Sequence, residues 1–195
     1  MSDNKYHNKY RVDTALAQWH DYDGGIYFIT ICTKNREHFF GKIEHEEMFL
    51  SIIGKHTRQN IEQITSHNPY AEVPLYVIMP NHLHFIVVID HDKTPHDKRS
   101  INISRTQSTV ETFPETSLQR MVPIEYATSM QSWLSVVIRQ FKQSITRFAN
   151  ENGIDFAWQP RFHDHIIRNN DDLNQIATYI ENNVIRWQED EFYTP

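Results

Sequence analysis

The sequence contains a single cysteine, Cys32, among its 195 residues. One cysteine cannot form a disulfide within the chain or build a cysteine-based metal cluster, so we expect a buried thiol in a reducing compartment. Long hydrophobic runs are also missing: none approaches the roughly 20 residues that a membrane-spanning helix requires, and no N-terminal segment resembles a signal peptide. These absences predict a cytoplasmic protein without a membrane partner.

Positive charge is scarce as well, because 19 Lys and Arg residues against 25 Asp and Glu residues give a formal net charge of -6. Non-specific affinity for duplex DNA comes mainly from Lys and Arg side chains that neutralise phosphates, so the charge argues against a protein that coats DNA. A local basic groove remains compatible with it. The hydrophobic content of 39% is typical of a globular protein, and 195 residues fit most simply into one domain.

Two stretches lack the periodicity of regular structure. Residues 1–22 are polar and aromatic, and we interpret them as an N-terminal arm that precedes a single domain at 23–190. Residues 91–128 are rich in Thr, Ser, His, Pro and charge. This composition predicts a long insertion within the domain that is mobile in part.

The hydrophobic pattern of the rest predicts an α+β fold. We expect strands at 26–33, 70–79, 82–89 and 164–168, and helices at 44–63, with a break near Gly54, at 130–149 and at 171–188. The turn Met79-Pro80-Asn81 between the second and third strands predicts a hairpin. Elements in this order build a ferredoxin-like antiparallel β-sheet with helices packed on one face.

The stretch MPNHLHFIVVID at 79–90 places two histidines in one of the most apolar runs of the chain. Strand side chains alternate between faces, so His82 and His84 point to one side while Leu83 and Phe85 point to the other. Two adjacent imidazoles are a candidate ligand pair for a divalent metal, and buried core histidines are the alternative. The spacing alone leaves the metal and the third ligand open. Further candidate ligands are His38, His45, His163 and His165.

The last predicted helix carries a second cluster of polar residues. Tyr179 and Asn183 are four residues apart, so a helix places them on the same face, with Asn182 slightly to one side. That face would present a phenol and an amide oxygen together. A packing tyrosine followed by asparagines at a frayed helix end is the alternative interpretation.

Basic and aromatic residues are interleaved in the last third of the chain. Aromatic rings stack on unpaired bases while cations hold the backbone, which is how single-stranded nucleic acid is commonly bound. Ordinary amphipathic helices also place Arg and Lys on a solvated face, so this signal alone is weak. The candidate DNA-binding residues are Arg139, Lys142, Arg147, Trp158, Arg161 and Arg168.

Three blocks in the sequence contain most of these residues: MPNHLHFIV at 79–87, WQPRFHDHIIRN at 158–169 and YIENN at 179–183. In this order they resemble the signature blocks of the single-tyrosine HUH transposases, and the most similar branch is the REP-associated tyrosine transposases. The segment GIYFITICTKNR at 25–36 is similar to the first strand and turn of that group. The resemblance covers most of the chain and leaves out the arm and the insertion.

The resemblance implies the HUH nuclease fold and a DNA transposase, that is, a site-specific endonuclease and strand transferase acting on single-stranded or hairpin DNA. His82, His84 and Asn183 would bind Mg²⁺ or Mn²⁺, and Tyr179 would form a 5′-phosphotyrosine intermediate. Relatives include homodimers, so a homodimer is compatible with the resemblance. Many members follow the tyrosine block with Asn-Pro, whereas Val184 follows Asn183 here, so we expect the helix to continue.

Two other functions are compatible with parts of the sequence. A domesticated module that binds hairpin DNA or RNA without cleavage is suggested by the net charge and the altered tyrosine block. A zinc hydrolase built on the 12 histidines is disfavoured, because the chain has no His-Glu-x-x-His pattern.

Overall fold

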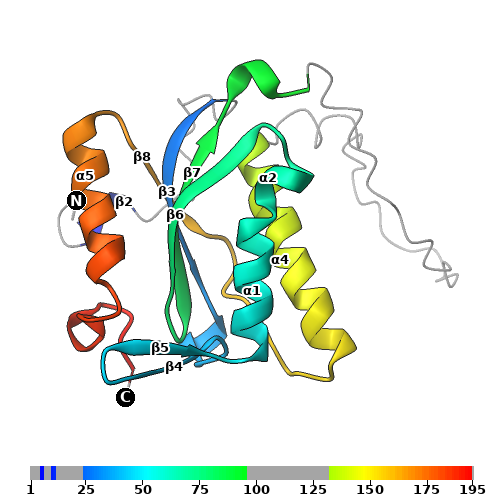
Figure 1. Ribbon diagram of the computed structural model, residues 1–195, viewed down its shortest axis with the longest axis vertical. Coiled ribbons are helices and arrows are strands. Elements are labelled where there is room, and N and C mark those ends of the chain that lie inside the picture. Colours follow the sequence, from blue (N-terminus) through cyan, green and yellow to red (C-terminus); the bar gives the residue numbers. More distant parts are fainter. Residues whose placement is uncertain (1–4, 7–9, 12–23, 96–131, 195) are drawn as a thin grey trace, which may run out of the picture.

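The computed structural model describes residues 5–6, 10–11, 24–95 and 132–194 (Figure 1). Most of the predicted arm lies outside these residues, apart from the short antiparallel strands β1 (Lys5–Tyr6) and β2 (Tyr10–Arg11). The predicted insertion also lies outside them beyond residue 95, and η2 (His91–Lys93) marks its start.

The centre of the fold is a four-stranded antiparallel sheet. Its strands are β3 (Gly25–Cys32), β6 (Ala71–Ile78), β7 (His82–Ile89) and β8 (His163–Ile166), in the order β6-β7-β3-β8. Strands β6 and β7 form the predicted hairpin, and β3 pairs antiparallel with both β7 and β8. The predicted α+β fold with an antiparallel sheet is therefore confirmed.

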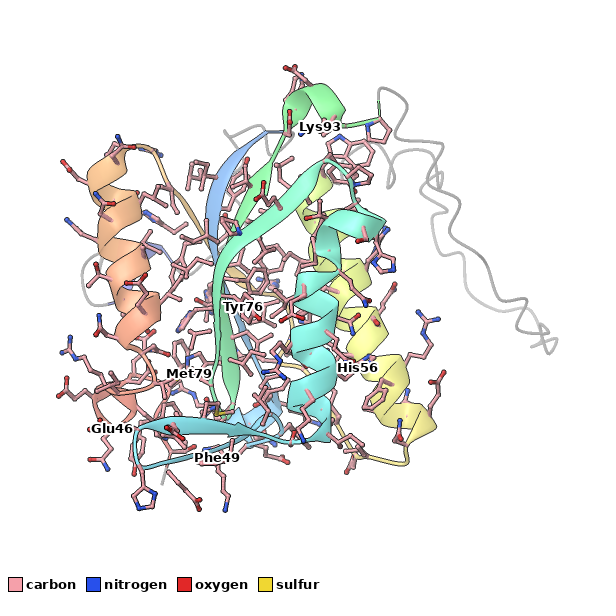
Figure 2. All side chains as sticks on the ribbon, viewed as in Figure 1. Glu46, Phe49, His56, Tyr76, Met79 and Lys93 are labelled. Atoms are coloured by element: carbon pink, nitrogen blue, oxygen red, sulfur yellow. The ribbon has the colours of Figure 1, made fainter. Side chains whose placement is uncertain are left out.

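Two long helices cover one face of this sheet. They are α1 (Ile52–Glu62), which continues into the short α2 (Ile64–His67), and α4 (Trp133–Glu151). The odd-numbered residues of β7, from Leu83 to Ile89, join their buried apolar side chains in the main hydrophobic core. Side chains fill the space between α1 and the sheet (Figure 2).

The remaining helix, α5 (Asn170–Asn182), lies against the opposite face of the sheet (Figure 1). Ile180 of α5 packs with Ile86 of β7 and with Ile167 in a second, smaller apolar cluster. The helices therefore lie on both faces of the sheet, whereas the sequence pattern predicted helices on one face only. The physical reason is that this second face also carries apolar residues beyond the histidines, and these need cover from water.

The helix predicted at 44–63 begins later, because its first residues form a hairpin of β4 (Gly41–Glu44) and β5 (Glu47–Leu50). The two-residue turn between these strands has both φ angles positive, 51° at His45 and 64° at Glu46, which is the backbone of a tight hairpin turn. Ser51 is the N-cap of helix α1, and its Oγ accepts a hydrogen bond from the N–H of Gly54 at 3.0 Å. The expected break at Gly54 is absent, since α1 runs through it without interruption.

The helix predicted at 171–188 is shorter than expected. It ends at Asn182, and turns lead into η4 (Trp187–Glu189). The chain therefore folds back towards the sheet instead of continuing along the helix axis. Within the ranges that the structure describes, no helix is long and apolar enough to span a bilayer.

Candidate active site

His82 and His84 lie side by side on the face of β7 that α5 covers. Their ring centroids are 4.5 Å apart, and the two residues are 0% and 1% exposed. Burial, with a smaller contribution from the nearby Arg36, lowers the pKa of His82 to about 3. Burial, together with His82, also holds the pKa of His84 well below 6.5. Both imidazoles are therefore neutral near pH 7, the state in which histidine binds metals.

Each histidine has one polar contact that fixes its ring. Nδ1 of His84 lies 2.8 Å from Oγ1 of Thr30, the residue directly opposite on β3. Nδ1 of His82 lies 2.8 Å from Oδ1 of the neighbouring Asn81. Nε2 of His82 is buried and has no hydrogen-bond partner among the described residues. A buried polar nitrogen without a partner is costly and calls for an explanation.

Helix α5 brings Tyr179 to the histidines. Its hydroxyl oxygen is 3.1 Å from Nε2 of His84, and the hydroxyl donates a hydrogen bond to Oδ2 of Asp190 at 3.1 Å. Partial burial and the carboxylate of Asp190 raise the pKa of Tyr179 above its usual value. The residue is still 41% exposed, so a large substrate can approach the phenol.

Asn183 lies one helical turn after Tyr179, as its spacing predicts. Its Nδ2 donates a hydrogen bond to Oδ2 of Asp190 at 2.6 Å. Its Oδ1 is buried and lacks a hydrogen-bond partner within the described ranges. Tyr179, His82, His84 and Asn183, which come from two distant segments of the sequence, are thus brought into one cluster.

Asp190 belongs to the cluster but was not predicted from the sequence. One ligand atom each from Asp190, His82 and His84 lies within 4.8 Å of the others, which makes these three a candidate cation group. The carboxylate reaches the histidines because α5 ends at Asn182 and the chain turns back. No motif could have singled it out, since it sits in the acidic run EDE at 189–191.

The four histidines considered as further ligands are not in this group. His38 contacts Oγ1 of Thr194 at 2.7 Å, and Nε2 of His165 pairs with Asp172 at 2.9 Å. His163 and His45 lie outside the group as well. Among the described residues, the polar groups beside the histidine pair are therefore the carboxylate of Asp190 and the amide of Asn183.

These donors fit a divalent cation. Two buried polar atoms, Nε2 of His82 and Oδ1 of Asn183, have no hydrogen-bond partner in the described part of the chain. Two neutral imidazoles and the amide oxygen of Asn183 form a mixed nitrogen and oxygen donor set that suits a first-row divalent metal such as Mn²⁺, with the carboxylate of Asp190 beside it. A cation would give both lone pairs a partner.

The C-terminal segment closes one side of the cluster. The ring of Phe192 lies 4.6 Å from that of His82, and its carbonyl accepts a hydrogen bond from Nδ2 of Asn81 at 2.8 Å. Arg36 lies over the Phe192 ring at 4.9 Å. Beside Tyr179, Asn183 and Asp190 the surface is hollowed to about 340 Å³, so the cluster is approached from the side of Tyr179.

A second hollow of about 570 Å³ lies along α4. Four of the predicted DNA-binding residues line it: Arg139, Lys142, Arg147 and Arg161. Because α4 and α5 cover opposite faces of the sheet (Figure 1), this basic groove is separate from the tyrosine cluster.

Lys142 and Trp158 have structural contacts within this region. Nζ of Lys142 donates hydrogen bonds to the carbonyls of Gln159 at 3.0 Å and Arg161 at 2.9 Å, and burial lowers its pKa to about 8. Trp158 packs against the main core and donates its Nε1–H to the carbonyl of Lys142 at 3.2 Å. Arg168 is exposed beyond β8 and does not line the groove.

No protein-family model matches the sequence. An uncharacterised protein of Haemophilus influenzae is 31% identical over 185 residues, which cover 94% of this chain and 93% of that protein. A second Haemophilus influenzae protein, described as a REP-associated tyrosine transposase, is 26% identical over 163 residues, 84% of this chain and 72% of its own. The chain is a relative of the REP-associated tyrosine transposases.

A solved structure agrees with this relationship at the level of the fold. A REP-associated tyrosine transposase bound to a REP hairpin superposes with a TM-score of 0.53 at 19% identity, covering 89% of this chain and 74% of that one. The fold that the sequence blocks predict is thus confirmed.

Proposed function

We propose that this transposase relative is a metal-dependent endonuclease and strand transferase that cuts hairpin or single-stranded DNA with Tyr179. The observation that carries the proposal is the contact of the Tyr179 hydroxyl with both Nε2 of His84 and the carboxylate of Asp190, beside two buried acceptors that lack partners. This arrangement combines a nucleophile, a proton acceptor and a cation-binding group, the parts that phosphoryl transfer requires.

We assign His82, His84 and Asn183 as ligands of Mg²⁺ or Mn²⁺, and Asp190 as the proton acceptor. When bound, the cation would stabilise negative charge on the scissile phosphate. Tyr179 gives its proton to Oδ2 of Asp190 as its oxygen forms a bond to phosphorus. The bond from phosphorus to the 3′-oxygen breaks, and the departing 3′-oxygen takes up a proton from water. The products are a 5′-phosphotyrosine and a 3′-hydroxyl, and attack by another 3′-hydroxyl reverses the step and joins a new strand.

The substrate assignment has separate support. The related solved transposase is bound to a REP hairpin, and this chain presents a basic groove along α4. We propose that Arg139, Arg147 and Arg161 contact phosphates of the hairpin there. Lys142 and Trp158 support the loop that carries Arg161, and Arg168 is proposed as a phosphate contact near the start of α5.

The test is to incubate purified protein with labelled hairpin oligonucleotides and Mn²⁺, Mg²⁺ or EDTA, and to look for protein-linked DNA on denaturing gels. We expect a metal-dependent adduct that Tyr179→Phe abolishes. Tyr193→Phe is the matched control, because Tyr193 is similarly exposed at 38% and lies in the nearby C-terminal segment. An adduct that persists in Tyr179→Phe would contradict the proposal.

A hairpin-binding module without cleavage is the second candidate. It is favoured by the raised pKa of Tyr179, since burial first and the negative charge of Asp190 second make the phenolate less stable. Binding of the hairpin without an adduct under any metal condition would support this function instead.

A further inference from the structure

In both histidines of the cluster, Nδ1 has a buried partner, and Nε2 is the ring nitrogen that would bind the cation. Oγ1 of Thr30 and Oδ1 of Asn81 each lie 2.8 Å from a histidine Nδ1, and Thr30 and Asn81 are 6% and 0% exposed. A neutral imidazole carries its hydrogen on only one nitrogen, and the partner of Nδ1 decides which. These two partners therefore control whether Nε2 has a free lone pair.

The contact with Asn81 permits only one neutral tautomer of His82. Its Nδ2 donates hydrogen bonds to the carbonyls of Phe192 at 2.8 Å and Arg36 at 3.3 Å, which fixes the amide with Oδ1 towards His82. An amide oxygen only accepts hydrogen bonds, so Nδ1 of His82 carries the hydrogen. Nε2 of His82 then has a lone pair, and this is the buried nitrogen that lacks a partner among the described residues.

The contact with Thr30 permits both neutral tautomers of His84, because a hydroxyl can donate or accept a hydrogen bond. The Tyr179 hydroxyl gives its hydrogen to Asp190, so its oxygen is able to accept a hydrogen from Nε2 of His84, with Thr30 donating to Nδ1. A cation on Nε2 needs the opposite tautomer. Rotation of the Thr30 hydroxyl permits it, since the oxygen then accepts from Nδ1–H.

We propose that Asn81 and Thr30 are positioning residues for the cation site, with Asn81 fixing His82 in one tautomer and Thr30 allowing His84 to exchange between Tyr179 and a divalent cation. The part that concerns the cation rests on the proposed function. The tautomer of His82 in the metal-free protein does not depend on the proposed function. An experiment can therefore contradict the role of Asn81 without contradicting the proposed function, and the reverse.

The first experiment is nitrogen NMR of the full chain with ¹⁵N-labelled histidine, which distinguishes protonated from unprotonated ring nitrogens. Without metal we expect the hydrogen on Nδ1 of His82 and on Nε2 of His84. Saturation with Mg²⁺ should move the His84 hydrogen to Nδ1 and leave His82 unchanged. A hydrogen on Nε2 of metal-free His82 would overturn the role of Asn81, and an unchanged His84 with Mg²⁺ bound would overturn that of Thr30.

The second experiment measures Mn²⁺ affinity by calorimetry without DNA. Thr30→Val should weaken binding by about 10- to 100-fold, the usual effect of losing a partner behind a metal ligand, while Thr30→Ser keeps the hydroxyl and should restore binding. Thr57→Val is the matched control, because Thr57 is fully buried on α1 and its hydroxyl has no hydrogen-bond partner among the described residues.

Equal affinity of Thr30→Val and the wild type would overturn the role of Thr30 while leaving the proposed function intact. A wild-type protein that binds neither Mn²⁺ nor Mg²⁺ would overturn the metal chemistry of the proposed function and the role of Thr30 together. In that case the NMR result on metal-free His82 still decides the role of Asn81.

Discussion

Strand β7 buries both of its faces, but the two faces have different chemistry. On one face Leu83, Phe85 and Val87 are 0% exposed and pack into the main core with α1 and α4. On the other face His82 and His84 are buried just as completely, under α5 and the C-terminal segment. The comparison shows that depth of burial does not distinguish a core position from a candidate site position.

The difference lies in the partners that each face receives. The apolar face needs only close packing, whereas each buried imidazole needs hydrogen bonds to offset the loss of water. Thr30 and Asn81 provide one such partner for each ring, and Tyr179 provides another for His84. Nε2 of His82 has no such partner in the described part of the chain, which is the feature that makes this face a candidate for binding a cation.

The largest expected effect comes from breaking the apolar face. Phe85→Ala should lower the free energy of unfolding by about 3–5 kcal/mol, because the packed core cannot fill the cavity left by the ring. Urea denaturation measures this change. Phe49→Ala is the control, since Phe49 is 47% exposed on the β4–β5 hairpin (Figure 2) and should change stability by only about 0.5 kcal/mol. Equal losses in both variants would contradict the assignment of the core.

The next effect concerns the chemistry of the polar face. Asp190→Asn removes the proton acceptor of Tyr179 and should slow formation of the DNA adduct by about 100-fold or more. Mn²⁺ affinity should change little, because His82, His84 and Asn183 remain. Single-turnover gels and calorimetry measure the two quantities. Loss of Mn²⁺ binding in this variant would show that Asp190 is a ligand.

Acid should lower the free energy of unfolding through the buried histidine His82 on the polar face. In the unfolded chain His82 takes up a proton near pH 6.5, but in the folded chain only near pH 3, so the unfolded state binds more protons between these values. Stability should therefore be unaffected by His82 above pH 6.5 and fall as the pH decreases towards 3, by about 3 kcal/mol at pH 4. Urea titrations of the metal-free protein should show a smaller fall in His82→Gln. An equal fall in both proteins would contradict the buried neutral state of His82.

The smallest effect tests the basic groove, which lies on the apolar side of the sheet. Arg147→Gln should weaken hairpin binding by about 3- to 10-fold and reduce the slope of log affinity against log salt by about 1. Arg58→Gln on α1 is the control, because Arg58 is exposed but does not line the groove. Fluorescence anisotropy at several salt concentrations measures both. Equal weakening by both variants would remove the groove as a binding site.

The period-2 pattern of β7 predicted its boundaries and its two faces, because that pattern follows directly from strand geometry. The helix predicted from residue 44 was wrong in its first turns, where Met48, Phe49 and Ile52 have a spacing that is compatible with a helix. The hairpin there depends on two residues with positive φ, His45 and Glu46, neither of which is a glycine. Local sequence gave no strong signal for such a turn.

The cluster was predicted in part for a similar reason. Local periodicity placed His82 with His84 and Tyr179 with Asn183, and the structure brings the two pairs together. Asp190 could not be found in this way. If the helix continued to residue 188, Asp190 would lie about 10 Å beyond Asn183 along the helix axis, at 1.5 Å per residue. Its position depends on where α5 ends, and that of Thr30 depends on the register of β3.

The most direct test of the account is to identify the residue that becomes linked to DNA. Purified protein would be incubated with a hairpin oligonucleotide and Mn²⁺, digested with nuclease and protease, and analysed by tandem mass spectrometry. The account predicts a nucleotide attached through its 5′-phosphate to Tyr179. A nucleotide on another residue, such as Tyr193, or an unmodified Tyr179 in protein that demonstrably cleaves the hairpin, would contradict it.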